Sequence, residues 1–106
     1  VGAAGLAAYC TSKGALNQLT RTMALELADK QINVNAVAPG AINAPMLFSE
    51  HATQAAADSV VERNQGSIPI GDVAQPEEVA RAVLFLATER HITGTILSVD
   101  GGYTAT

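Results

Sequence analysis

Charged residues are scarce in this chain, and basic residues are the scarcer sign. Only 15% of its 106 residues are Asp, Glu, Lys or Arg, and the six basic residues leave a formal net charge of −4. No two basic residues are adjacent. Because nucleic acids and anionic membrane surfaces bind clustered Lys and Arg, we expect no nucleic-acid or membrane partner. A low share of charge also leaves little polar surface, so we expect much of the chain to be buried in its fold, or against another segment or subunit.

Cysteine is limited to Cys10, and long apolar runs are absent. A single cysteine excludes an intrachain disulfide and a cysteine-based metal cluster, and we expect no metal site. We expect Cys10 to be a small buried residue, and a chain without disulfides fits a reducing cytoplasm. No apolar stretch approaches the length of a transmembrane helix.

The chain begins at Val1, without an initiator methionine. Its first six residues lack the basic start and the long apolar core of a signal peptide. We expect the chain to be an internal piece of a longer polypeptide, with the true N-terminus upstream.

Helical and β-branched segments alternate along the sequence. Apolar residues at helical spacing predict a helix over about residues 8–28, and Pro76 with two following glutamates suits the start of a second helix that ends before His91. The runs 32–38 and 95–99 are apolar and β-branched, as buried parallel strands are. The order predicts a parallel α/β sheet with right-handed crossovers. Because a two-stranded sheet is rarely stable alone, we expect further strands upstream.

Two further expectations concern the inward face of the second helix and the long stretch that precedes it. The second helix should turn Val79, Ala82, Val83 and Leu86 inward. The long, weakly patterned stretch 41–71, with a possible helix over 52–63, is more typical of a functional lid than of a spacer. Met46, Leu47 and Phe48 in it would either pack the lid or form an apolar substrate wall.

Tyr9 and Lys13 form a Tyr-x-x-x-Lys pattern at the start of the first expected helix. Residues four apart lie on one helix face, so the phenol and the ammonium would be neighbours. A free phenol is a poor base at neutral pH, whereas a nearby positive charge favours the phenolate, which accepts a proton. The start of a crossover helix lies at the sheet edge where ligands bind. Taken alone, the pattern also occurs in many helices with a packed Tyr and a solvated Lys.

Two further motifs end the expected strands. Residues 35–42 read Asn-Ala-Val-Ala-Pro-Gly-Ala-Ile, and the tail runs from Thr93-Gly94 to Asp100-Gly101-Gly102. A glycine after a strand lets the backbone approach a flat ligand closely, because glycine has no Cβ. Each motif by itself is also a simple strand-ending turn.

Together, in this order and spacing, the motifs and the Pro-Glu-Glu-Val-Ala segment at 76–80 closely resemble the single-domain branch of the short-chain dehydrogenase/reductase family. The resemblance covers essentially all of residues 1–106. It implies a Rossmann-type, doubly wound parallel sheet of which this chain is the C-terminal portion. It also implies an NAD- or NADP-dependent oxidoreductase that interconverts a secondary alcohol and a ketone by hydride transfer, similar to 3-oxoacyl-carrier reductases or to alcohol and sugar dehydrogenases.

The resemblance assigns roles to matching residues. Tyr9 would be the catalytic acid and base, and Lys13 would hold the nicotinamide ribose hydroxyls and favour the phenolate of Tyr9. Pro39, Gly40 and Ile42 would line the nicotinamide, with the Ile42 backbone near its carboxamide. Residues from 43 to about 66 would form the substrate lid, and Asp100-Gly101-Gly102 would be structural.

Departures from the family pattern limit what the chain does alone. Ala44 stands at a cofactor-contacting position where family members usually carry Thr, and it has no hydroxyl to donate. The glycine-rich phosphate loop and the catalytic Ser and Asn are not in this sequence. We therefore expect the chain to be inactive by itself, as a fragment of a protein more than twice its length. A dinucleotide-binding sensor, or a non-catalytic protein that keeps only the fold, are the alternatives.

The resemblance also bears on partners. It implies a dimer or tetramer that uses the first helix, whose face opposite Tyr9 carries Thr11, Gly14, Gln18 and Leu25. The sequence leaves open the choice between NAD and NADP, the substrate and the direction of the reaction. His51, His91 and Tyr103 are expected to have solvated, capping or packing roles.

Overall fold

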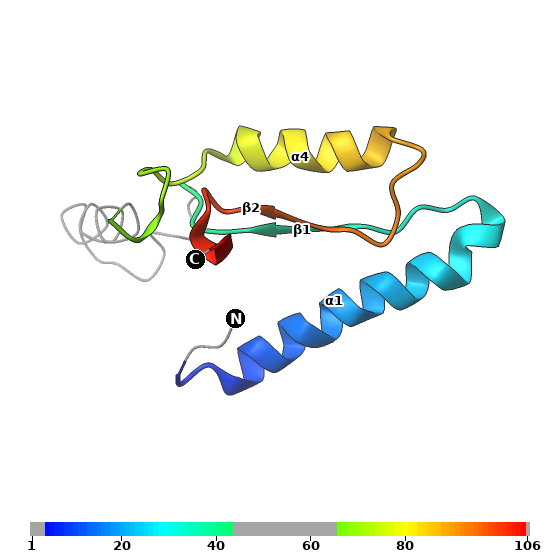
Figure 1. Ribbon diagram of the computed structural model, residues 1–106, viewed down its shortest axis with the longest axis horizontal. Coiled ribbons are helices and arrows are strands. Elements are labelled where there is room, and N and C mark those ends of the chain that lie inside the picture. Colours follow the sequence, from blue (N-terminus) through cyan, green and yellow to red (C-terminus); the bar gives the residue numbers. More distant parts are fainter. Residues whose placement is uncertain (1–3, 44–65, 106) are drawn as a thin grey trace. The chain divides into compact units, whose positions relative to one another are not determined.

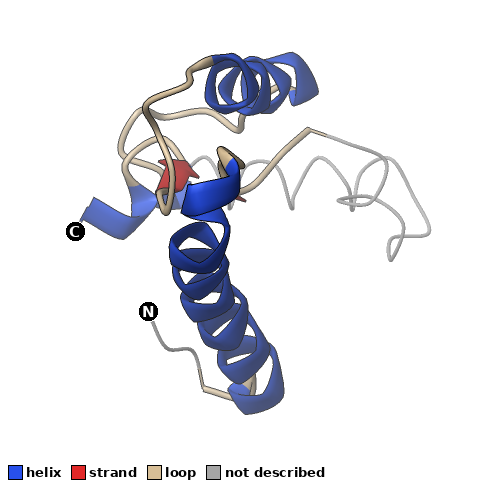
Figure 2. Cartoon of the chain, turned by 90° about the vertical axis from the view of Figure 1, so that its right-hand side faces the viewer, coloured by secondary structure: helices blue, strands red, loops and turns tan. Residues whose placement is uncertain are grey.

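The computed structural model describes residues 4–43 and 66–105. Helices and strands alternate along the chain, as the sequence predicts (Figure 1). The elements, in order, are helix α1 (Ala7–Leu27), a 3-10 turn (Ala28–Lys30), strand β1 (Ala36–Pro39), helix α4 (Pro76–Thr88), strand β2 (Ile96–Val99) and a second 3-10 turn (Tyr103–Ala105). Helix accounts for most of the regular structure and the two strands are short (Figure 2).

Helix α1 matches the helix expected over 8–28 to within one residue at each end. It has no side-chain cap at its start and no acidic residue in its first turn, so packing of its inner face must hold it. Thr20 and Ala24 are its buried residues. The helix passes into the 3-10 turn and ends at Gln31, whose backbone is left-handed (φ 59°) and whose N–H donates to Ala28 O at 3.0 Å.

The described residues form two compact units, each considered by itself. Of the described residues, the first contains 4–36 and 84–97, and the second contains 37–43, 66–83 and 98–105. In the first unit, a Cβ added to Gly94 (φ 79°) would lie 3.5 Å from the Cβ of Ala24, so the inner face of α1 meets this turn closely.

Strands β1 and β2 are hydrogen-bonded neighbours and run parallel. The N–H of Ala36 donates to Thr95 O at 2.9 Å and the N–H of Gly40 donates to Val99 O at 3.1 Å, so residue numbers rise together along both strands. This confirms the parallel sheet. Strand β1 is shorter than the expected 32–38, because Asn33, Val34 and Asn35 bond to residues 89–95 through the side chains of Asn33, Thr93 and Asn35 instead of through a regular ladder.

Helix α4 begins at Pro76, as predicted. The carboxylate of Glu78 accepts a hydrogen bond from the N–H of Gln75 at 3.3 Å, which caps the first turn. Leu86 is buried and Val79 and Ala82 are half-buried, as expected. Val83 is 51% exposed, so its predicted inward position was wrong for this chain: it lies at one edge of the stripe centred on Val79 and Leu86, and Ala82 lies at the other edge.

Several sequence-based expectations lie outside the described residues. These are Ala44, the Met46–Phe48 cluster, His51, the helix over 52–63 and nearly all of the lid over 43–66. No helix in residues 4–43 or 66–105 combines the length and the apolar character that crossing a membrane requires.

Candidate functional site

Tyr9 and Lys13 lie one turn apart near the start of α1, in the first unit. The Lys13 Nζ sits 5.5 Å from the centroid of the Tyr9 ring, within the range of a cation–π contact. Tyr9 is 59% exposed, so its phenol is open to a ligand. Ser12, between them, donates its hydroxyl hydrogen to the Tyr9 carbonyl at 2.8 Å and holds the first turn. The pair therefore offers an accessible proton donor beside a fixed positive charge.

The segment after β1 belongs to the second unit and presents backbone groups. Ile42 forms a parallel bridge with Ala74. The bridge consists of a 2.8 Å bond from Asn43 N–H to Ala74 O and a 3.1 Å bond from Ala74 N–H to Ala41 O. Because successive peptide groups of an extended chain point to opposite sides, the N–H and C=O of Ile42 point away from Ala74. They have no hydrogen-bond partner within 4–43 and 66–105, so they form a ready donor and acceptor.

Gly40 lies so close to Asp100, at the end of the neighbouring strand, that a side chain at position 40 would clash. A Cβ on Gly40 would lie 2.9 Å from the Cβ of Asp100 and 3.1 Å from its Cα. Such a contact is closer than two carbon atoms tolerate. The glycine thus allows the ends of the two strands to approach each other, a reason that the sequence alone did not indicate.

Asp100 organises the turn that follows β2. Its carboxylate accepts hydrogen bonds from Gly102 N–H at 3.0 Å, Thr104 N–H at 3.1 Å and the Thr104 hydroxyl at 2.6 Å. These bonds, the Thr104 hydroxyl first among them, lower the pKa of Asp100 below its usual 3.8, with desolvation opposing them. Gly101 (φ 62°) and Gly102 (φ 92°) supply left-handed backbone that the turn needs. The structural role expected of Asp-Gly-Gly agrees with this geometry.

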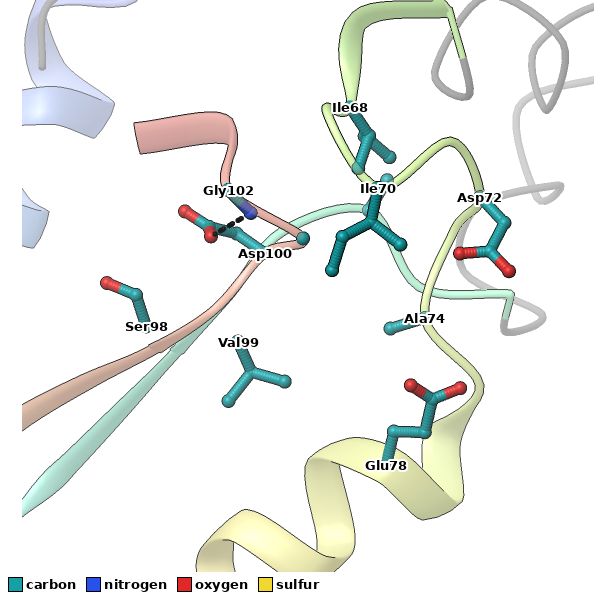
Figure 3. Close-up of a pocket in the computed structure, with 11 residues that line it drawn as sticks. Ile68, Ile70, Asp72, Ala74, Glu78, Ser98, Val99, Asp100 and Gly102 are labelled. Atoms are coloured by element: carbon teal, nitrogen blue, oxygen red, sulfur yellow. Dashed lines mark hydrogen bonds between the residues drawn. The ribbon is translucent and has the colours of Figure 1, made fainter. Parts of the chain in front are cut away.

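A cavity of about 280 Å³ opens in the second unit, beside the ends of β1 and β2 (Figure 3). Ile68, Ile70 and Val99 give it an apolar wall, and Asp72 and Glu78 add carboxylates at another side. The remaining lining residues are Ala41, Ala74, Ser98, Asp100, Gly101 and Gly102. The sequence did not predict this cavity, because its walls come from segments that are distant in the sequence. No local residue pattern indicates that these segments lie together.

The structure thus brings Tyr9 and Lys13 together in one unit and Pro39, Gly40 and Ile42 together in the other. None of these five residues lines the cavity, although Ala41 does. Across the described part of the chain, no three His, Cys, Asp or Glu side chains gather as metal ligands would.

Known proteins match this chain over nearly its whole length. The family described as Enoyl-(Acyl carrier protein) reductase matches residues 1–104. The 3beta-hydroxysteroid dehydrogenase 1 of Eggerthella lenta is 46% identical over 98 residues, which are 91% of this chain and 36% of that protein. The inactive 2-(S)-hydroxypropyl-CoM dehydrogenase 2 of Xanthobacter autotrophicus is 38% identical over 107 residues, covering 99% of this chain and 46% of that protein.

Solved structures share the fold. A short chain dehydrogenase family protein from Francisella tularensis superposes with a TM-score of 0.87 at 34% identity, over all of this chain and 47% of that one. A small-chain dehydrogenase in complex with NADPH gives a TM-score of 0.75 at 31% identity, over 88% of this chain and 41% of that one. The chain therefore spans less than half the length of these relatives, and its Rossmann-type α/β fold is confirmed. The chain belongs to the short-chain dehydrogenase/reductase family.

Proposed function

We propose that the full-length protein containing residues 1–106 is an NAD- or NADP-dependent oxidoreductase that interconverts a secondary alcohol and a ketone. The observation that carries this proposal is the accessible Tyr9 phenol with the Lys13 ammonium 5.5 Å from its ring. Membership in a family that includes a hydroxysteroid dehydrogenase supports the same reaction class.

Tyr9 moves the proton in this proposal. In alcohol oxidation, its phenolate oxygen accepts the hydroxyl proton as the carbon loses hydride, and in ketone reduction the phenol returns a proton to the carbonyl oxygen. Lys13 has its Nζ 5.5 Å from the centroid of the Tyr9 ring, where its positive charge attracts the negative charge that the phenolate carries between these steps. A nicotinamide cofactor, when bound, would supply the hydride chemistry, as acceptor in the oxidation and as donor in the reduction.

Several groups of the chain suit such a cofactor. Lys13 has three N–H donors for ribose hydroxyls, and the N–H and C=O of Ile42 can pair with a planar carboxamide. Pro39 and Gly40 would face the nicotinamide, as the family resemblance implies. Ala44 would lie at a cofactor contact without donating a hydrogen bond. The NADPH bound to a structural relative supports this cofactor class.

We propose further that the chain is the C-terminal half of its catalytic domain, with residues 43–66 as the substrate lid. Relatives are more than twice as long as the segment they share with it, which supports this division. Large apolar side chains also remain exposed, among them Leu19 and Leu84. The 106-residue chain by itself is then expected to reduce no ketone, because it would lack the glycine-rich loop and the catalytic Ser and Asn of the family.

The proposed partners are a small alcohol or carbonyl substrate and further copies of the same protein. Leu25 is 82% exposed on α1, and a Cβ on Gly14 would meet no atom within 4 Å, so this face is open to close helix contact. We propose that the face formed by Thr11, Gly14, Gln18 and Leu25 joins subunits of a dimer or tetramer. A cytoplasmic location stays a prediction from the cysteine content.

A dinucleotide-binding protein without turnover is the second candidate. One relative, 38% identical over 107 residues, is itself described as inactive, so this fold persists without catalysis. The presence of both Tyr9 and Lys13 favours the enzyme over this candidate.

The test is an absorbance assay at the reduced-nicotinamide band with the full-length protein. NAD and NADP are each supplied with a panel of secondary alcohols and the corresponding ketones. Tyr9→Phe should lower turnover about 10²- to 10⁴-fold, the usual contribution of an acid–base group. Tyr103→Phe, which removes the hydroxyl of the other tyrosine, should retain turnover. Cofactor binding without turnover would establish the second candidate, and absence of binding would overturn both.

A further inference from the structure

Asp100 is followed by Gly101, and no other Asp or Asn of the sequence precedes a glycine. An aspartate side chain can cyclise when the backbone nitrogen of the next residue attacks its carboxyl carbon. This nitrogen is most accessible when the next residue is glycine, because glycine has no Cβ to shield it. The turn after β2 therefore contains the least hindered position for this reaction in the sequence.

The Gly101 nitrogen is not held by a hydrogen bond. Its N–H has no partner among residues 4–43 and 66–105, whereas the Gly101 carbonyl accepts the N–H of Ile70 at 3.1 Å. The nitrogen is therefore free to attack, and protection against the reaction must come from the carboxylate of Asp100.

Both oxygens of the Asp100 carboxylate accept hydrogen bonds from residues beyond Gly101. One oxygen accepts Gly102 N–H at 3.0 Å (dashed line in Figure 3), and the other accepts the N–H and the hydroxyl of Thr104, at 3.1 and 2.6 Å. Cyclisation requires the carboxyl carbon to bond to the Gly101 nitrogen and to lose one oxygen, so these hydrogen bonds must break first.

The same hydrogen bonds favour the unreactive form of the side chain. A carboxyl group releases its oxygen as water only when it is protonated. The Thr104 hydroxyl, first among the causes, lowers the pKa of Asp100 below the usual 3.8 and so reduces the protonated fraction. Geometry and ionisation thus act in the same direction, and the Thr104 hydroxyl contributes to both.

We propose that Asp100-Gly101 is a site of spontaneous isomerisation to isoaspartate, and that the Thr104 hydroxyl keeps this site unmodified. The Gly101 nitrogen bonds to the Asp100 carboxyl carbon, and the amide proton leaves with the carboxyl OH as water, which closes a succinimide ring. Water then adds to one ring carbonyl and one C–N bond breaks. Breakage at the side-chain carbonyl restores aspartate, and breakage at the main-chain carbonyl gives isoaspartate. Water is the only other reactant.

Isoaspartate would disturb the contacts of the two glycines that follow. The main chain would run through the Cβ and Cγ of residue 100, which adds one atom to the backbone. Little room is left there, since a Cβ on Gly101 would lie 2.5 Å from Ile68 Cγ2 and a Cβ on Gly102 would lie 3.3 Å from Pro69 Cβ. The modification should therefore displace this wall of the cavity.

Asp72 provides a control within the same molecule. It is also exposed, in the loop before α4, but the residue that follows it is Val73. Val73 is β-branched and 6% exposed, so its nitrogen lies beside a bulky, buried side chain. We expect no isoaspartate at Asp72 under conditions that form it at Asp100.

The experiment incubates the full-length protein near neutral pH and follows isoaspartate at residue 100 by proteolysis and peptide mass spectrometry. Thr104→Val should raise its rate of formation about tenfold over the wild type, because a strong hydrogen bond to a charged group is lost. Thr104→Ser keeps a hydroxyl and should react as slowly as the wild type. Thr88→Val, which removes a hydroxyl bonded to carbonyls of α4, should also leave the rate unchanged.

The same assay in urea removes the fold from the comparison. Wild type and Thr104→Val should then react at equal rates, both faster than the folded wild type. Equal rates of the two folded proteins would overturn the role of Thr104. Isoaspartate formation at Asp72 as fast as at Asp100 in folded Thr104→Val would overturn the assignment of the site.

A second pair of variants decides the matter if Thr104→Val does not fold. Asp100→Asn and Asp72→Asn each place an amide where the carboxylate stands, and an amide nitrogen cannot accept a hydrogen bond. The first variant should lose ammonia through the same succinimide ring, seen as a mass gain of its peptide, and the second should keep its mass. Equal loss of ammonia at both positions, or none at residue 100, would overturn the proposal.

Discussion

Thr104 donates two hydrogen bonds to one carboxylate oxygen of Asp100, from its backbone N–H at 3.1 Å and from its hydroxyl at 2.6 Å. These bonds favour the ionised carboxylate, so the pKa of Asp100 lies lower in the folded protein than the usual 3.8. A group with a lowered folded pKa stabilises the fold above its unfolded pKa, and this contribution is lost as the pH falls through the folded value. The turn after β2 should therefore weaken below about pH 4.

Substitutions at this turn should reduce the acid sensitivity of the full-length protein. Thr104→Val removes the strongest bond and returns the pKa of Asp100 toward its usual value, so less stability is lost on acidification. The check is the thermal unfolding midpoint followed from pH 6 to pH 2.5. Thr88→Val is the control, because the Thr88 hydroxyl donates to backbone carbonyls and not to a carboxylate. If Thr104→Val and the wild type lost stability in parallel over this range, Asp100 would have no part in the acid transition.

Gly40→Ala should destabilise the full-length protein by about 1–3 kcal/mol, the usual cost of an added methyl group without room. The new Cβ would meet Asp100 Cβ at 2.9 Å, and neither atom can rotate away. Denaturant unfolding of Gly40→Ala, Asp100→Gly and the double variant measures the coupling. The alanine should cost less when residue 100 is glycine; additive losses would place the strain elsewhere.

Lys13→Met should weaken dinucleotide binding and turnover together. The methionine keeps an apolar stem but removes the positive charge near the Tyr9 ring and the N–H donors proposed for the ribose. Loss of a charged hydrogen-bonding group typically costs about 1.5–3 kcal/mol, or roughly one to two orders of magnitude in affinity. Calorimetric titration with NAD and NADP measures it, with Lys30→Met in the 3-10 turn as the matched control. Retained affinity and rate in Lys13→Met would remove Lys13 from the proposed site.

Leu25→Glu should shift the full-length protein to smaller assemblies. Leu25 is 82% exposed on α1, and a carboxylate there would be buried without a partner if this face joins subunits. Sedimentation velocity over a range of concentrations measures the change. Gln31→Glu, at the exposed end of the 3-10 turn, controls for one added negative charge. An unchanged sedimentation coefficient in Leu25→Glu would place the subunit contact elsewhere or show a monomer.

Helix α1 could be predicted almost to the residue because its helical spacing extends over about five turns. The alternation of elements and the strand-ending Pro39-Gly40 likewise follow from local chemistry. These features depend on each residue and its near neighbours in the sequence. The pairing of Tyr9 with Lys13 is of the same kind, since helix geometry alone makes residues four apart adjacent.

Features that depend on distant segments could not be predicted. Strand β1 starts four residues late because Asn35 bonds to residues 57 and 60 positions away. The only sequence signal was the presence of two asparagines, Asn33 and Asn35, in an otherwise β-branched run. The exposure of Val83 and the cavity near Ile68 likewise depend on tertiary contacts, which residue spacing does not specify.

Gln31, which closes the turn after α1, is the sole non-glycine residue with positive φ in residues 4–43 and 66–105. Left-handed backbone costs an L-residue about 1–2 kcal/mol, whereas glycine adopts it readily. The side chain of Gln31 is exposed, so little packing opposes its removal. A glycine at this junction, between the helix that carries Tyr9 and the strand that leads to Gly40, would therefore remove a backbone cost that the folded protein now carries. Gln31→Gly should therefore raise the thermal unfolding midpoint without changing any residue of the proposed site.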